Sequence, residues 1–164
     1  MGAAEENLNQ HLGKLVEQTI LWGLGLSAFA SATLLPGSSE ALLTGLLWEF
    51  PEHRWSLWAV ATLGNSLGSF TNWGLGRFLL QFLGRRWFPV SPEQYERATS
   101  WFSRYGIWTL LLAWTPILGD PLTVVAGALR VRFAVFCGLV TLGKALRYAF
   151  IVGAVVWGKE MLWS

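Results

Sequence analysis

Long apolar segments occupy most of this 164-residue chain and constrain its fold more than any other feature of the sequence. Residues 55–80 and 133–157 are each long enough, as a helix, to cross the ~30 Å hydrocarbon core of a bilayer. Residues 19–35 would reach only about 25 Å as a helix, which leaves open whether they cross. Hydrophobic residues make up 53% of the chain and charged residues only 13%, a composition that argues against a water-soluble monomer.

Two of the apolar regions are interrupted by proline and glycine. The first, residues 19–50, is broken at Pro36 and Gly37, and the second, residues 107–129, is broken around Gly119-Asp120-Pro121. The pieces on either side are too short to cross a bilayer, or borderline, so each region is expected to turn back on itself. We therefore predict two re-entrant helical hairpins, with breaks at Pro36, Gly37, Pro116, Gly119 and Pro121.

Polarity rises between residues 81 and 104, and this part of the chain predicts a helix on the membrane surface. Ser91-Pro92-Glu93-Gln94 has the form of a capping box with proline at the first helical position, so a helix is expected over about residues 91–104. Apolar and aromatic side chains recur there every three or four residues, opposite the charged ones. Such an amphipathic helix is typical of the membrane interface.

The two halves of the chain repeat the same order of features. Pro36 and Glu40 match Pro116 and Asp120, 80 positions later, and the tripeptide Thr-Leu-Gly recurs 79 positions apart. Chance similarity between apolar segments is the alternative. If each half is a hairpin followed by one crossing helix, the second half starts on the opposite side of the membrane, so the repeats are inverted.

The predicted fold is therefore all-α and polytopic, an inverted repeat with two re-entrant hairpins, spanning helices and an interfacial amphipathic helix. It forms a single membrane domain over residues 1–164, with a first repeat at about 27–80, the interfacial helix at about 91–104 and a second repeat at about 105–158.

Basic residues predict the orientation of this arrangement. Seven arginines would lie on one face of the membrane, against Arg54 and Lys159 on the other, with Lys14 unassigned. Because cytoplasmic loops carry the excess of basic residues, the first face is predicted to be cytoplasmic. The seven are Arg77, Arg85, Arg86, Arg97, Arg104, Arg130 and Arg132.

Four ionisable side chains fall inside the apolar segments, namely Glu40, Asp120, Lys144 and Arg147. Each unpaired charge costs roughly 2.5–3.5 kcal/mol near the bilayer centre, so the four must pair or meet water. Lys144 and Arg147 are three residues apart and share one face of the last helix. We expect the four to form a substrate-headgroup or proton site, and purely structural ion pairs are the alternative.

A stripe of small polar residues marks the crossing helix of the first half. Asn65, Ser69 and Asn72 follow at spacings of four and three and are candidates for lining a cavity, while close packing through nearby glycines is the alternative. His11 and His53 show no metal-ligand spacing. A net charge of +2 offers no nucleic-acid surface. No serine has a plausible histidine base. We therefore expect no cofactor, no metal, no nucleic-acid partner and no enzymatic activity.

Five motifs of the chain occur together in a known family. They are Ser31-Ala32-Thr33-Leu34-Leu35-Pro36-Gly37-Ser38-Ser39-Glu40, Gly64-Asn65-Ser66-Leu67-Gly68, Arg104-Tyr105-Gly106, Trp114-Thr115-Pro116-Ile117-Leu118-Gly119-Asp120 and Gly143-Lys144-Ala145-Leu146-Arg147-Tyr148. Over about residues 27–150 the chain resembles the YqaA-like branch of the bacterial DedA family, also called the VTT-domain or SNARE-associated family. The resemblance implies a multi-pass protein of the bacterial inner membrane, related to proteins implicated in moving undecaprenyl phosphate or phospholipids, with proton dependence.

One departure from the family pattern affects the expected site. Better-studied members of this family carry arginines around the proline of the second hairpin, where this chain has Ala113 and Gly119-Asp120. A phosphate-binding role therefore does not transfer to these positions. Lys144 and Arg147 are the candidates to supply the positive charge instead.

The sequence thus predicts a transporter or scramblase for an anionic lipid, a polyprenyl phosphate or a phospholipid, with proton coupling left open. Membrane lipids are then the partners, and a homo-oligomer remains open. Two alternatives stay in place: a proton-coupled carrier of a small solute or drug cation, and a structural membrane protein.

Overall fold

The computed structural model describes residues 2–32, 37–115 and 119–163, and every regular element within these ranges is a helix. This confirms the all-α prediction for the described residues. The predicted breaks at Pro36 and Pro116 lie outside them. The α-helices are α1 (Gly2–Ser31), α2 (Ser38–Glu49), α3 (Arg54–Phe78), α4 (Pro92–Tyr105), α5 (Gly119–Ala128) and α6 (Phe133–Trp163), and the 3-10 helices are η1 (Pro51–His53), η2 (Leu80–Phe82) and η3 (Gly106–Trp114).

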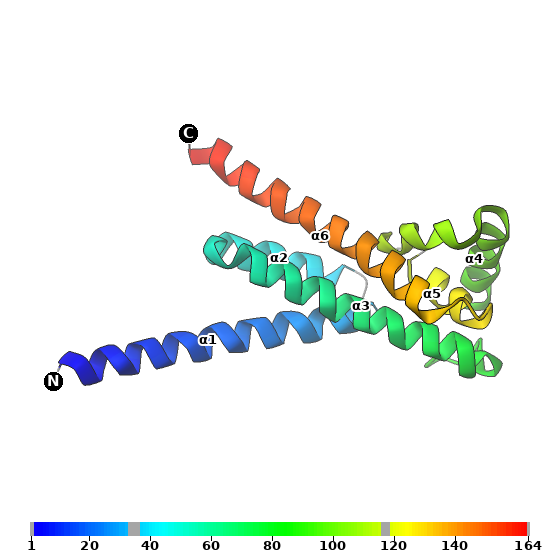
Figure 1. Ribbon diagram of the computed structural model, residues 1–164, viewed down its shortest axis with the longest axis horizontal. Helices are drawn as coiled ribbons and strands as arrows, with labels where there is room; N and C mark the ends of the chain where they lie inside the picture. The colour runs from blue at the N-terminus through cyan, green and yellow to red at the C-terminus, as the bar shows by residue number, and fades with distance from the viewer. Residues whose placement is uncertain (1, 33–36, 116–118, 164) are drawn as a thin grey trace.

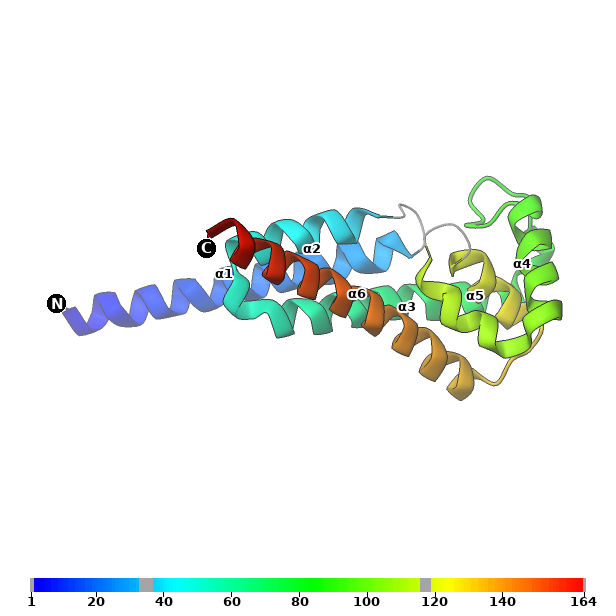
Figure 2. The ribbon, with the colours of Figure 1, turned by 90° about the horizontal axis from the view of Figure 1, so that it is seen from above.

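Most of the helices lie along one long axis of an elongated molecule (Figure 1). α1 runs from the left end toward the middle, and α2 runs back to the left (Figures 1 and 2). From the right end, η3 runs toward the middle and α5 runs back to the right (Figure 2). α3 and α6 pass alongside both pairs in opposite directions, and α4 lies across the right end. The inner ends of the two helix pairs therefore approach each other near the middle.

α3 is the central helix, because it packs against α1, α5 and α6. α2, from the first half of the chain, packs on α6 from the second half. α5, from the second half, packs on α3 from the first half, so each half contacts the long helix of the other. Glycines make these contacts close. A methyl group at Gly64 or Gly68 would collide with the backbone of α1, and one at Gly76 would collide with the carbonyl of Val124 in α5. Small residues at such seams let helix backbones approach each other.

The second hairpin differs in detail from the prediction. Gly119 and Pro121 do not separate two helices, because both lie in the first turn of α5. Proline fits a first turn, where its missing N–H would have no intrahelical partner. Gly37, by contrast, directly precedes α2 with φ 93°, a left-handed conformation that glycine adopts readily. The arm before the second break is a 3-10 helix, η3, with a longer rise per residue than an α-helix.

The capping box predicted at Ser91 is confirmed. The Gln94 N–H donates to Ser91 Oγ at 3.3 Å, and the Ser91 N–H donates to Gln94 Oε1 at 2.9 Å. Part of the apolar face of α4 is used inside the molecule, because Ala98 and Phe102 are buried against α5 and η3, while Tyr105 is 51% exposed. α4 is thus an amphipathic helix packed across the end of the bundle, and its location at the membrane surface stays a prediction.

The surface of the molecule is larger than that of a compact soluble protein of the same mass, and it exposes many large apolar side chains. The accessible area is 10137 Å², against about 8,100 Å² expected for a compact soluble monomer of 18.2 kDa. Large apolar side chains are exposed on several helices, including Leu26, Leu63, Leu67, Leu146 and Phe150. Contiguous apolar surface of this kind needs a lipid environment or a protein partner.

One helix in the described residues, α6, is long and apolar enough to cross a bilayer by length and composition. Only 28% of its most apolar window is buried inside the molecule, so most of that window faces outward. α3, which we also expected to cross, carries Asn65, Ser69 and Asn72 on its buried side, and these polar residues lower its mean hydropathy.

Basic residues separate along the long axis. The C-terminal end of α3, the loop after it, α4 and the α5–α6 connection all lie at the right end in Figure 1 and carry the seven arginines grouped together above. Arg54 begins α3 and Lys159 lies in the last turns of α6, both toward the left. Lys14 belongs to the N-terminal half of α1, which also lies to the left.

Candidate functional site

A small polar cavity lies where the inner ends of the two helix pairs approach each other. It has a volume of about 20 Å³, enough for about one water molecule. Residues from both halves of the chain form its wall: Ser31, Ala32, Gly37, Asn65, Ala113, Thr115, Asp120, Lys144 and Arg147. Three of the four predicted ionisable site residues are among them. Packing thus joins segments more than 80 positions apart around one polar centre.

Lys144 is the most deeply buried of the charged site residues, with 3% of its surface exposed. Its ammonium donates to the backbone carbonyl of Asn65 at 3.1 Å and also to the Asn65 side-chain oxygen. The sequence predicted that carboxylates would balance this cation, but its nearest acceptors are amide oxygens of α3. A buried ammonium can be tolerated when its N–H groups are hydrogen-bonded in this way.

Arg147, one turn further along α6, forms an ion pair with Glu40 of α2. Both side chains are partly buried, with 18% of Arg147 and 32% of Glu40 exposed. Next to this pair, the hydroxyls of Ser39 and Tyr148 are hydrogen-bonded at 2.8 Å. The inner end of α2 is therefore fixed to α6 by two adjacent polar contacts.

Asp120 lies in the first turn of α5, where the helix dipole favours a negative charge. It shares the cavity wall with Lys144, to which it is attracted electrostatically. Within the described ranges, no cationic nitrogen lies within the 4.0 Å of an ion pair with Asp120. The two acids are therefore not equivalent, because Glu40 is paired directly and Asp120 faces the cavity.

The three polar residues of α3 that were predicted to line a cavity have different environments in the structure. Asn65 lies on the cavity wall, and its side-chain N–H donates to the carbonyl of Ala28 at 3.0 Å. Asn72 donates to the carbonyl of Ala32 at 2.7 Å, so it joins α3 to the inner end of α1. Ser69 is fully buried on the same helix. Helix packing and cavity lining thus occur on adjacent parts of one face.

A wide apolar groove opens beside the polar cavity. Its volume is about 650 Å³, and its lining is mostly aliphatic and aromatic: Glu40, Leu111, Gly143, Leu146, Arg147, Phe150 and Ile151. Leu146 and Phe150 are 62% and 78% exposed, so the groove lies on the outer side of α6. Arg147 lines both the groove and the cavity, whereas Glu40 lies at the groove.

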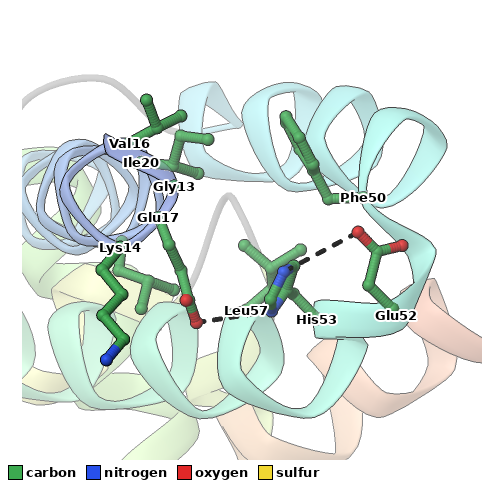
Figure 3. A pocket seen from close by; sticks show the side chains of 10 residues that line it. Gly13, Lys14, Val16, Glu17, Ile20, Phe50, Glu52, His53 and Leu57 are labelled. Atoms are coloured by element: carbon green, nitrogen blue, oxygen red, sulfur yellow. Dashed lines mark ion pairs between the residues drawn. The ribbon is translucent and has the colours of Figure 1, made fainter. Parts of the chain in front are cut away.

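A second pocket, of about 570 Å³, lies between α1 and the start of α3, at some distance from this site (Figure 3). His53 lies there between two carboxylates, with its Nδ1 3.4 Å from Glu17 and its Nε2 3.7 Å from Glu52. Because the two acids approach opposite ring nitrogens, they do not form a chelating set with the histidine around one metal ion.

Several residues of the site were not identified from the sequence. Tyr148 and Ser39 form a buried contact, and Ser31 and Thr115 lie on the cavity wall. Each is a small or polar residue next to a predicted site residue or near a predicted helix break. Their positions in the sequence could therefore have identified them as candidates for the site. Which of them turn inward depends on how the helices are rotated against each other.

Comparison with known proteins places the chain in a family. The VTT domain model matches residues 35–156. The chain belongs to the VTT-domain family. It is 44% identical over 147 residues to inner membrane protein YqaA of Escherichia coli, a DedA-family member, covering 90% of this chain and 97% of that protein. An uncharacterized protein of Haemophilus influenzae is 37% identical over 136 residues, covering 77% of this chain and 82% of that protein.

A more distant relative carries a functional name. Undecaprenyl phosphate transporter A of Staphylococcus aureus is 25% identical over 115 residues, covering 58% of this chain and 57% of that protein. No solved structure matches the chain. The VTT-domain match spans α2, α3, the η3–α5 pair and most of α6, and therefore every residue of the cavity wall except Ser31 and Ala32 at the end of the first helix.

Proposed function

We propose that this VTT-domain protein moves an anionic lipid across the bacterial inner membrane and that Arg147 receives the lipid phosphate. The observation that carries the proposal is the position of Arg147, which lines both the polar cavity and the apolar groove. A phosphate-bearing lipid needs both environments at once, a cationic donor for its headgroup and an apolar surface for its chain.

The groove supplies the apolar surface. Leu111, Leu146, Phe150 and Ile151 offer about 650 Å³ in which a polyprenyl or acyl chain can lie against α6. Its phosphate then lies beside the guanidinium of Arg147, which presents paired N–H donors that match phosphate oxygens. In the structure the Glu40 carboxylate is paired with this guanidinium. Exchange of the Glu40 carboxylate for the phosphate is the binding step that we propose.

Lys144 provides a second positive charge behind Arg147. It lies one turn earlier on α6 and faces the small cavity together with Asp120. A headgroup that leaves the groove for the centre of the molecule would meet Lys144 next, provided the helix ends separate, because the cavity has room for only about one water molecule. Movement of the lipid therefore requires opening between the two helix pairs.

The proposal includes the predicted topology. We infer that α3 and α6 cross the membrane, that the α1–α2 and η3–α5 pairs enter it from opposite sides, and that the arginine-bearing end is cytoplasmic. The opposite directions of the two pairs support this arrangement (Figure 2). So does the contact between Asn65 and Lys144, which lie 79 positions apart, the spacing of the sequence repeat. The name of the Escherichia coli relative supports the inner membrane.

The choice of an anionic lipid also draws on the Staphylococcus aureus relative, whose name specifies undecaprenyl phosphate. The alternative of a small-solute carrier receives less support from the geometry. The polar cavity is too small for most solutes, whereas the larger groove is almost entirely apolar. Uptake of a soluble cation into vesicles, driven by a pH gradient and lost in Glu40→Gln, would identify that alternative.

The test is a lipid-movement assay with purified protein in phosphatidylethanolamine vesicles. Each vesicle carries trace amounts of fluorescent phosphatidylglycerol or fluorescent polyprenyl phosphate, and a membrane-impermeant quencher reports which leaflet the probe occupies. We expect the parent protein to accelerate exchange of at least one probe. Arg147→Ala and Leu146→Trp should abolish the acceleration, the first by removing the phosphate donor and the second by filling the groove.

Two control variants match these changes. Arg104→Ala removes an exposed arginine of α4, and Leu142→Trp adds the same bulk one turn before Leu146 on an exposed part of α6 outside the groove lining. Both should keep the parent rate. Unchanged exchange in Arg147→Ala, with normal amounts of folded protein, would refute the assigned role.

A further inference from the structure

A column of buried polar atoms without hydrogen-bond partners runs along α3. In the described part of the chain, the hydroxyls of Thr62, Ser66 and Ser69, the side-chain oxygen of Asn72 and the indole N–H of Trp73 are all enclosed and unpaired. These residues extend over about 16 Å of helix, roughly half the thickness of a hydrocarbon core. Buried polar groups in native proteins are nearly always satisfied, by protein or by ordered water.

The unpaired hydroxyls differ from other hydroxyls in the same molecule. Thr19, Thr71 and Thr99 each donate to the carbonyl four residues earlier, the usual way for a helix to satisfy such a group. Thr62, Ser66 and Ser69 make no such bond. The Asn72 side chain donates its amide N–H to Ala32, but its oxygen accepts no hydrogen bond, and the indole N–H of Trp73 donates none. The column therefore needs a partner outside its own helix.

Four of the five residues lie along the interface between α3 and α6, and Asn72 lies beside them, toward the end of α1. Thr62, Ser66, Ser69 and Trp73 follow at spacings of four, three and four, so they share one side of α3. At the Trp73 end, the indole packs against Phe133 and Phe136 of α6, with ring centroids 5.0 and 6.1 Å apart. Near the other end, the Trp58 indole donates to the carbonyl of Ala145 in α6 at 2.9 Å.

The polar cavity adjoins this interface at its centre. Asn65, which lies between Thr62 and Ser69 along α3, is on the cavity wall and accepts hydrogen bonds from Lys144. Lys144 has three N–H donors, and two of its acceptors belong to Asn65, so it retains donor capacity toward the cavity. The cavity has room for about one water, which needs polar partners such as these.

We propose that the α3–α6 interface from Thr62 to Trp73 binds a chain of ordered water molecules that continues into the cavity beside Lys144 and Asp120. Water matches the hydrogen-bonding needs of all five groups. It can donate to the Asn72 oxygen, accept from the Trp73 N–H, and either donate to or accept from the three hydroxyls. The chain keeps the buried charges in contact with water inside an otherwise apolar bundle. It does not depend on which molecule the protein transports.

The experiment is X-ray radiolysis of the protein in lipid nanodiscs containing ¹⁸O-labelled water. Hydroxyl radicals generated from bound water oxidise neighbouring side chains, and mass spectrometry locates the incorporated oxygen. We expect Trp73 to be oxidised severalfold faster than Phe150, although Phe150 is 78% exposed, because Phe150 faces lipid. In the variant Thr62→Val/Ser66→Ala/Ser69→Ala the oxidation of Trp73 should fall severalfold, and in Thr71→Val it should be unchanged.

A second measurement uses the same variants. If the interface is dry, deleting three unsatisfied hydroxyls removes a penalty and raises the melting temperature in detergent above that of the parent. If water occupies the interface, the substitutions remove hydrogen-bond partners of that water, and the melting temperature stays the same or falls. Oxidation of Trp73 no faster than that of Phe150, or a melting temperature that rises in the triple variant, would overturn the proposal. A loss of lipid movement alone would not affect it.

Discussion

The ammonium of Lys144 donates to both oxygens of Asn65, the backbone carbonyl and the side-chain amide, and so joins α6 to α3 at the centre of the molecule. The two residues lie 79 positions apart, the same offset at which the tripeptide Thr-Leu-Gly recurs in the sequence. An amide in the first half thus faces a cation at the corresponding position of the second. This contact allows a charge to be buried where the inner ends of both helix pairs approach.

Loss of the Asn65 side chain should destabilise the protein. In Asn65→Leu, Lys144 keeps the backbone acceptor but loses its side-chain partner while it remains buried. We expect a loss of about 3 kcal/mol in the free energy of unfolding, measured by titration with sodium dodecyl sulfate in mixed micelles. The double variant Asn65→Leu/Lys144→Met removes both polar partners and should recover most of the loss. Equal stability of the parent and the single variant would show that the side-chain contact contributes nothing.

Exchange of the two charges in the Glu40–Arg147 pair separates its structural role from its transport role. In Glu40→Arg/Arg147→Glu, an ion pair can still join α2 to α6, so expression and unfolding should stay close to those of the parent. The cation, however, would then be on α2. Position 147 of α6, which lines both the groove and the cavity, would carry a carboxylate. We expect lipid exchange in vesicles to be lost. Full exchange activity in this double variant would mean that the pair only holds the fold together.

Two neighbouring glycines of α3 should respond to alanine in opposite ways. A methyl group at Gly76 would collide with the carbonyl of Val124, so Gly76→Ala should cost at least about 1–3 kcal/mol through forced separation of α3 and α5. A methyl group at Gly74, two residues earlier, meets nothing within 4 Å. Gly74→Ala should therefore stabilise by about 0.5–1 kcal/mol through helix propensity. The same detergent titration measures both, and a similar effect of the two variants would contradict the close α3–α5 contact.

The start of α4 should depend on pH through Glu93. The Ser91 hydroxyl donates to the Glu93 carboxylate at 2.7 Å and lowers the pKa of Glu93 below its ordinary value of 4.5. A carboxyl group whose pKa is lowered by folding stabilises the folded form above pH 4.5, and this contribution is lost as the pH falls through the lowered pKa. Hydrogen exchange at the first turn of α4 should therefore accelerate below about pH 4.5.

The variant Glu93→Gln is the control for this pH dependence. It has no charge to lose, so its exchange rates at the first turn, corrected for intrinsic chemistry, should not show the additional acceleration at low pH. The remaining capping contacts between Ser91 and Gln94 are expected to persist in it. An equal acceleration in parent and variant would assign the effect to another group.

Local features of the sequence predicted local structure well. The capping box at Ser91 required only four neighbouring residues, because its hydrogen bonds close within one turn, and α4 begins where it was expected. Gly37 marked the start of α2 for a similar reason, since its left-handed conformation is a property of that single residue. Gly119 and Pro121 were misplaced by a few positions, because proline is compatible both with a break and with a first helical turn.

The partners of the buried charges were less predictable. The sequence placed two acids and two bases in apolar segments and so required that their charges be satisfied. It did not assign Lys144 to Asn65 or Arg147 to Glu40, and it did not indicate that the hydroxyls of α3 would be left without partners. Each of these outcomes depends on the rotation and height of α6 relative to α2 and α3.

By itself, the sequence determined that the chain is helical, that it needs lipid around it, and that four buried charges must find partners. These follow from composition and from interactions within a few residues. Only the tertiary structure decided which group each charged side chain contacts. It also decided that Arg147 lines both a polar cavity and an apolar groove. These outcomes depend on residues such as the close-packed glycines of α3, whose lack of a side chain sets the distances between helices that lie far apart in the chain.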